Sequence, residues 1–113
     1  MLLGSCTHSR RYVDWEIKSS LRYDAYTLPN GLIGIVLPSQ NNRCYLPARF
    51  ENNWDQQHYN CYARFYPYPS LDQQLVEWIE DAYIARTQRK HLINNSRVML
   101  GYNAKCNIHG ATH

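Results

Sequence analysis

Hydrophobic positions divide the start of the chain into two apolar runs separated by an amphipathic stretch. Residues 1–4 and 32–37 form apolar runs, a pattern typical of strands that are covered on both faces of a parallel sheet. Between them, Thr7 and Ser9 are both suitable helix N-caps. One apolar side chain then recurs every four residues, at Val13, Ile17 and Leu21. These features predict a right-handed strand–helix–strand unit.

A second, longer helix is predicted after a short aromatic strand. The strand is expected over residues 61–66, and the prolines that follow it end it. Ser70 has the capping-box spacing to Gln73 and should begin the helix, which we expect to reach about Arg89. Its predicted buried stripe consists of Leu71, Leu75, Trp78, Ile79, Ala82 and Ala85.

Two stretches lack clear periodicity. Residues 39–60 are polar, although a turn over residues 46–50 should pack Leu46 and Phe50 against the sheet. We expect residues 1–93 to form a partial domain and residues 94–113 a loosely ordered C-terminal tail. A doubly wound domain needs about four or five strands, and the chain opens inside an apolar strand. The sequence therefore predicts an α/β domain that lacks its N-terminal strands.

Composition and charge place the 113 residues among globular proteins, because 44% are hydrophobic and 19% charged. The net charge of +3 is scattered, which argues against a nucleic-acid partner. The basic residues at 10–11 and 86–90 are expected on solvated helix faces, although phosphate contact by Arg10 and Arg11 is an alternative. The aromatic run over residues 59–68 is expected in the core rather than stacked on bases.

Cysteine usage and hydropathy bear on the cellular compartment. The cysteines are widely spaced and show no metal-ligand pattern, at Cys6, Cys44, Cys61 and Cys106. No secretory leader is recognisable, and no apolar run approaches the roughly 18 residues of a membrane span. We therefore expect free thiols, no metal and no membrane partner in a cytoplasmic protein.

Glu16 is the carboxylate to which we assign a chemical role. Asp14 and Lys18 stand four residues apart with the acid first, which favours a surface ion pair. Glu16 has no such partner, since Tyr, Ser and Val occupy the neighbouring positions on its helix face. Spacing alone favours a solvated helix carboxylate. Tyr12 and Trp15 are our candidates for an apolar or stacking wall beside it.

Several stretches resemble the TIR-like proteins of the Thoeris antiphage system. Residues 3–17 are similar to the family's strand-to-helix segment, in which an apolar strand, a glycine turn, a threonine and an Arg–aromatic–Val step lead to aromatic–Glu–Ile. Ile33-Gly-Ile-Val36 is similar to the strand that follows. Matches to the family's C-terminal portion lie in residues 61–69, 75–82 and 92–97.

The resemblance implies a flavodoxin-like, TIR-type parallel sheet with flanking helices. It also implies that NAD is a substrate rather than a cofactor, cleaved at the nicotinamide–ribose bond. The ADP-ribose part would become a cyclic nucleotide signal for a Thoeris effector. Glu16 matches the family's catalytic glutamate by position. A carboxylate beneath the sugar can stabilise the positive charge that develops on the ribose while it engages the ribose hydroxyls.

Two functions stay open, because the family's first strand and its early nucleotide-contacting residues have no counterpart in this sequence. One is a NAD glycohydrolase or ADP-ribose cyclase that is complete only with an N-terminal half. The other is a non-catalytic TIR-like interaction or assembly module, with self-association as one form of assembly.

Overall fold

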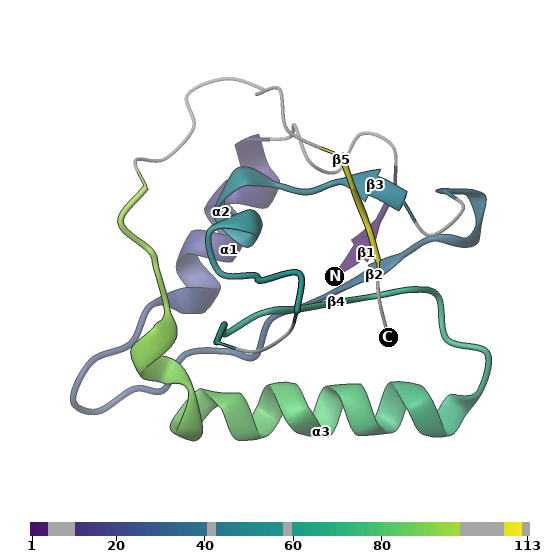
Figure 1. The fold of residues 1–113 in the computed structure, drawn as a ribbon. Coiled ribbons are helices and arrows are strands. Elements are labelled where there is room, and N and C mark those ends of the chain that lie inside the picture. Colours follow the sequence, from purple (N-terminus) through teal and green to yellow (C-terminus); the bar gives the residue numbers. More distant parts are fainter. Residues whose placement is uncertain (5–10, 41–42, 58–59, 98–107, 112–113) are drawn as a thin grey trace.

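The computed structural model of the chain describes residues 1–4, 11–40, 43–57, 60–97 and 108–111. In chain order the elements are β1 (Leu2–Leu3), α1 (Arg11–Leu21), β2 (Ile33–Val36), a 3-10 turn (Pro38–Gln40), β3 (Arg43–Tyr45), α2 (Ala48–Glu51), β4 (Arg64–Tyr66), α3 (Asp72–Gln88), a second 3-10 turn (Lys90–Leu92) and β5 (Ile108–Gly110). Figure 1 shows α1 and α2 on one side of the central strands and α3 along the other.

A parallel sheet forms the middle layer. Within the described residues its strand order is β1-β2-β4, with Leu3 opposite Val36 and Gly34 opposite Phe65. Successive residues of β2 face opposite layers, so Val36 packs toward α1 and α2 and Ile35 toward α3. Both faces are therefore covered, which explains the unbroken apolar run. The predicted α/β architecture, a parallel sheet with flanking helices, is confirmed.

The larger core fills the space between the sheet and the pair α1 and α2. Its buried members include Ile17 of α1, Leu46 and Phe50 around α2, and Phe65 of β4. The Phe50 and Phe65 rings meet edge to face with their centroids 6.4 Å apart. The predicted packing of Leu46 and Phe50 against the sheet is confirmed.

The opposite face of the sheet is covered by α3. Trp78 stacks on Tyr66 of β4, with ring centroids 4.2 Å apart and planes 3° from parallel. The predicted buried stripe is right for Trp78, Ala82 and Ala85 and wrong for Leu71 and Ile79, which are exposed. Ala82 and Ala85 let α3 lie close to the sheet, so the stripe of α3 that is buried against the sheet is narrow. Ile79 is turned about 100° from Trp78 around the helix and lies outside it.

The start of α3 differs from the predicted cap. The helix begins at Asp72, after Leu71 in an extended conformation, and not directly after Ser70. Gln74, rather than Gln73, reaches back with its side-chain oxygen, which accepts from the backbone N–H groups of Ser70 at 3.0 Å and Leu71 at 3.2 Å. The predicted capping box is therefore wrong by one residue. The cap position is Leu71 and not Ser70, so the Gln three residues after the cap is Gln74.

The basic residues near the end of α3 are less solvated than expected. Arg89 donates two hydrogen bonds to the carboxylate of Asp81, at 3.0 and 2.9 Å, and its side chain is 17% exposed. Arg86 Nε donates to the Pro29 carbonyl at 3.0 Å. The prediction of a solvated face is therefore wrong for Arg89, because Asp81 draws its guanidinium toward the sheet.

A small antiparallel ladder joins two segments with no strand signal in the sequence. β3 pairs with β5, and Cys44 lies opposite His109.

The segment after α3 is held by the side chain of Asn53. Asn53 donates a hydrogen bond to the Asn94 carbonyl at 2.8 Å and accepts one from the Asn94 N–H at 2.7 Å. The division into residues 1–93 and a loosely ordered tail stays a prediction, since much of that tail lies outside the described residues.

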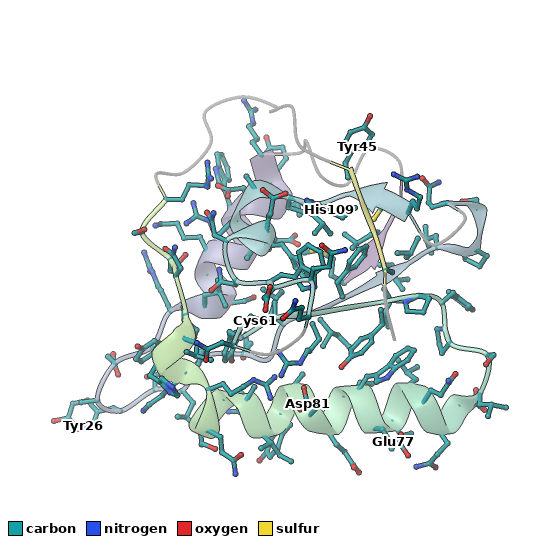
Figure 2. All side chains as sticks on the ribbon, in the orientation of Figure 1. Tyr26, Tyr45, Cys61, Glu77, Asp81 and His109 are labelled. Carbon is teal, nitrogen blue, oxygen red and sulfur yellow. The ribbon has the colours of Figure 1, made fainter. Side chains whose placement is uncertain are left out.

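The aromatic run and the cysteines are described in part. The strand predicted over residues 61–66 spans only Arg64–Tyr66. Tyr62 and Tyr66 are buried, as expected of core residues, whereas Tyr68 is exposed. Cys44 and Cys61 are buried free thiols, and Figure 2 shows Cys61 in the interior. Other predictions concern residues outside the described part of the chain, namely Cys6, Thr7, Ser9, Arg10, Tyr59 and Cys106.

The described residues contain neither a membrane-spanning helix nor a cluster of metal-ligating side chains. None of the helices in that part of the chain has the length and apolar character needed to cross a bilayer. The same residues contain no cluster of three or more His, Cys, Asp or Glu side chains arranged to hold a metal ion.

Candidate functional site

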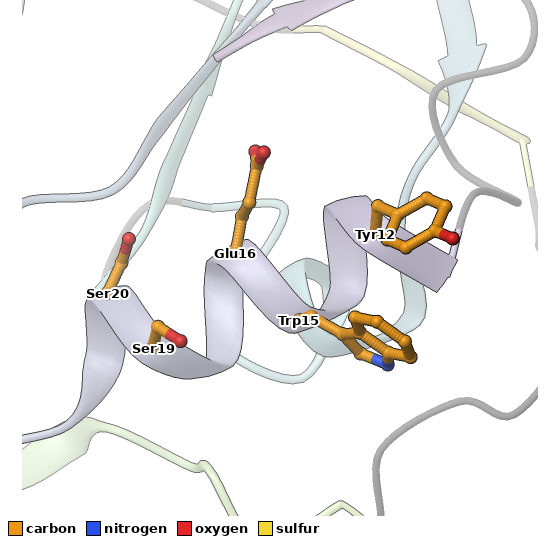
Figure 3. Close-up of a pocket in the computed structure, with 5 residues that line it drawn as sticks. All are labelled: Tyr12, Trp15, Glu16, Ser19 and Ser20. Carbon is orange, nitrogen blue, oxygen red and sulfur yellow. The ribbon is translucent and has the colours of Figure 1, made fainter.

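The candidate residues meet along the exposed side of α1. An open depression with a volume of about 530 Å³ is lined by Tyr12, Trp15, Glu16, Ser19 and Ser20. Helix geometry explains the grouping, because residues three and four apart share a face. Figure 3 shows Glu16 and Ser20 rising from the helix, with the two aromatic rings nearer its start. The structure thus brings the three sequence candidates, Tyr12, Trp15 and Glu16, onto one surface.

An aromatic pair with an attached positive charge forms one end of the depression. The rings of Tyr12 and Trp15 meet edge to face, with centroids 5.0 Å apart at 84°. The Arg11 guanidinium lies 5.0 Å from the Tyr12 ring centroid and 5.9 Å from that of Trp15, and donates to the Tyr12 hydroxyl at 3.2 Å. Arg11 thus packs on the rings by cation–π contact instead of extending into water.

Glu16 supplies negative charge one helical turn after Tyr12 and directly after Trp15 in the sequence. The side chain is exposed, and the depression is open on the side away from the helix. A carboxylate in this position can accept hydrogen bonds from hydroxyls or sit beside a developing positive charge. Such charge stabilisation is strongest where water is excluded. The described residues therefore form one wall of a site, and a second wall would be needed to enclose a ligand.

The expected surface pair of Asp14 with Lys18 is wrong. Asp14 is 2% exposed, and its carboxylate accepts from Arg49 Nε at 2.9 Å and from Nη2 at 3.2 Å. A sequence signal for this was present, because Asp14 stands three and seven residues before Ile17 and Leu21, on the inward stripe of the helix. A carboxylate buried there needs a charged partner, and the planar fork of an arginine matches it.

Arg49 links three segments that are far apart in the sequence. It is fully buried, and its Nη1 donates to the Asn95 side-chain oxygen at 3.0 Å. Asn95 Nδ2 in turn donates to the Lys18 carbonyl of α1 at 3.1 Å. The network holds α1 against α2 and the segment after α3, and so sets the orientation of the helix that carries Glu16. The sequence assigned no role to Arg49 or Asn95, although they lie in segments that it singled out, residues 46–50 and 92–97.

The fold and the site define an α/β domain compatible with TIR-like folds, built on a parallel sheet with a glutamate on the helix after its first described strand. The family model described as "Thoeris protein ThsB, TIR-like domain" matches residues 1–42. The expected resemblance is confirmed for this segment, which contains Tyr12, Trp15 and Glu16. The match covers 42 of the 113 residues of the chain. No curated protein and no solved structure matches the chain.

Proposed function

We propose that this chain is the part of a Thoeris TIR-like enzyme that carries the catalytic glutamate, and that the substrate is NAD. The observation that carries the proposal is the position of Glu16. It lies within the matched residues 1–42 and shares an open depression with Tyr12 and Trp15. The aromatic pair is the proposed contact for a flat ring of NAD, and Arg11, which packs on both rings, is the proposed positive charge for its phosphates.

In the proposed reaction the bond between the nicotinamide nitrogen and ribose C1′ breaks. The electron pair of that bond leaves with nicotinamide, which becomes neutral, and positive charge develops on the ribose. The Glu16 carboxylate stabilises this charge and accepts hydrogen bonds from the ribose hydroxyls. Attack at C1′ by water, with loss of a proton, gives ADP-ribose. Attack by an atom of the ADP-ribose part itself, again with loss of a proton, gives a cyclic nucleotide, the proposed signal to a Thoeris effector.

We also propose that further protein completes the site, because the described lining of the depression comes from α1 alone. The described face of α1 can contact only one side of a bound ribose, so water would reach the other side and weaken the charge stabilisation. An N-terminal half of the domain is the proposed second wall. Activity of the chain by itself should consequently be low but measurable.

The first testable prediction is that nicotinamide release from NAD depends on Glu16. Glu16→Gln keeps the size of the side chain and removes its charge, so we expect release to fall about 100-fold or more. Chromatography of nicotinamide and mass analysis of the nucleotide product provide the measurement. Glu77→Gln, which changes an exposed carboxylate on α3, is the matched control and should be unaffected. Equal release by the wild type and Glu16→Gln, or none by the wild type, would contradict the proposal.

The second candidate function is a non-catalytic assembly module. It is favoured by the apolar side chains that α3 leaves exposed, including Ile79 and Tyr83. This function predicts no nicotinamide release by the wild-type chain, together with self-association that does not depend on NAD.

A further inference from the structure

The outer face of α3 carries a row of exposed apolar side chains. Val76, Ile79 and Tyr83 are 46%, 52% and 67% exposed. Their spacing of three and four residues places them in one stripe along the helix. Figure 1 shows α3 at the margin of the molecule, with the sheet on its inner side. A stripe of this kind on a water-facing helix marks a surface for protein contact.

The outer face of α3 has both a ridge of apolar side chains and hollows beside it. One hollow of about 240 Å³ lies between α3 and the segment that runs from Gly31 into β2, and another of about 370 Å³ lies along α3. Ile79 and Tyr83 line both hollows and form the ridge between them. Helices pack by placing the ridge of one into the groove of the other. A face that contains both shapes can therefore receive a copy of itself.

Charge is divided between the two ends of α3. Asp72 lies in the first turn of α3, and Arg86 lies in the last turn with Lys90 just beyond the helix end. Arg86 is held beside the ridge, since its guanidinium lies 4.8 Å from the Tyr83 ring centroid. Two such helices placed antiparallel would bring the acidic end of each against the basic end of the other. A partner of a single charge sign would match only half of the face.

We propose that α3 is the interface of a symmetric dimer, in which a second copy of this chain packs its α3 antiparallel against the first. In one register, Asp72 lies level with Lys90, Val76 with Arg86, and Ile79 with Tyr83 of the other copy. All three pairs have the same midpoint along the helix, at Asp81, as a twofold axis requires. In this register Arg86 also lies between Asp72 and Glu80 of the other copy.

Sedimentation of the full chain over a range of concentrations tests the dimer. The wild type should pass from monomer to dimer as concentration rises. Ile79→Glu places a carboxylate from each copy at the centre of the apolar contact, so the dissociation constant should rise about tenfold or more. Tyr26→Glu is the matched control, because Tyr26 is 98% exposed and lies at the tip of the loop after α1 (Figure 2). Circular dichroism checks that each variant is folded.

Charge exchange tests the register. Asp72→Lys and Lys90→Asp should each raise the dissociation constant about two- to fivefold, because each places like charges opposite one another at an exposed contact. The double variant restores opposite charges and should dimerise like the wild type. A wild type that stays monomeric, an unaffected Ile79→Glu, or a double variant without recovery would overturn the proposal. Glu16→Gln should dimerise normally, so this proposal and the catalytic one fail independently.

Discussion

At the scale of single residues, the pair formed by Asp14 and Arg49 decides how α1 sits on the molecule. Both side chains are almost completely buried, so each charge depends on the other for compensation. Helix α1 exposes Glu16 because Asp14, two positions earlier, faces inward toward Arg49. The orientation of the candidate catalytic carboxylate is therefore set by a contact in which it takes no part.

Arg49→Met is predicted to destabilise the fold by about 3–5 kcal/mol, because it leaves the Asp14 carboxylate buried without a counter-charge. Urea unfolding followed by circular dichroism measures the loss. Lys18→Ala is the matched control, because it removes the residue that spacing alone paired with Asp14. Its effect should stay within about 0.5 kcal/mol. A larger loss for Lys18→Ala than for Arg49→Met would contradict the buried pair.

Tyr62 gives a prediction about alkaline pH. Burial raises the pKa of its hydroxyl from 10.0 to about 12, and the charges of Arg86 and Arg89 offset part of this rise. Because the folded pKa lies above the unfolded one, the contribution to stability is complete below pH 10 and is lost as the pH rises through 12. The hydroxyl donates to the Asn30 carbonyl at 2.7 Å.

Tyr62→Phe should therefore cost about 1 kcal/mol at neutral pH through the lost hydrogen bond. It should also make stability fall less steeply between pH 10 and 12 than in the wild type. Urea unfolding at a series of pH values measures both effects. Tyr26→Phe alters an exposed tyrosine and should leave the pH profile unchanged. If the free energy of unfolding fell equally steeply with pH in the wild type and in Tyr62→Phe, Tyr62 would not be the source of the alkaline loss of stability.

At the scale of elements, the distance between α3 and the sheet layer is limited by backbone contact. A Cβ atom on Gly31 would lie 2.7 Å from the Ala82 carbonyl oxygen, closer than atoms can pack. The small side chains of Ala82 and Ala85 allow the same close approach along the inner stripe. The narrow contact that results leaves Ile79 and Tyr83 on the outer side, available for the proposed dimer.

Gly31→Ala should consequently push α3 away from the sheet and lower the free energy of unfolding by about 1–3 kcal/mol. Gly110→Ala is the matched control, because the nearest atom to its added Cβ would be the Arg43 side chain at an ordinary 3.9 Å. Thermal or urea unfolding compares the two variants. If both changed stability equally, the close approach of Gly31 to α3 would not be limiting.

At the scale of the whole molecule, the two proposed surfaces lie on opposite sides of the sheet. Figure 1 shows α1 in one outer layer and α3 in the other, so a dimer through α3 would leave the depression around Glu16 open. The face of α1 would remain available to the N-terminal half that we propose as its second wall. The proposed assembly and the proposed catalysis should therefore be altered separately by the variants at Ile79 and Glu16.

The sequence by itself determined the local features of this protein. The unbroken apolar run of β2 predicted a strand covered on both faces, and the spacing of Tyr12, Trp15 and Glu16 placed them on one side of a helix. Both features are local, because strand and helix periodicities are expressed within a few neighbouring residues. The resemblance of residues 3–17 to the Thoeris TIR-like proteins likewise depends on residues that are adjacent in the sequence.

Only the tertiary structure decided which charges are buried and which apolar residues remain in water. Asp14 pairs with Arg49 across 35 positions of the chain, and β3 pairs with β5 from the far end. Ile79 belongs to an apolar helix pattern yet stays exposed, because the close approach of α3 to the sheet narrows the buried stripe. These outcomes depend on how closely segments that are remote in sequence approach one another. The hydrophobic periodicity of a single helix or strand carries no information about that approach.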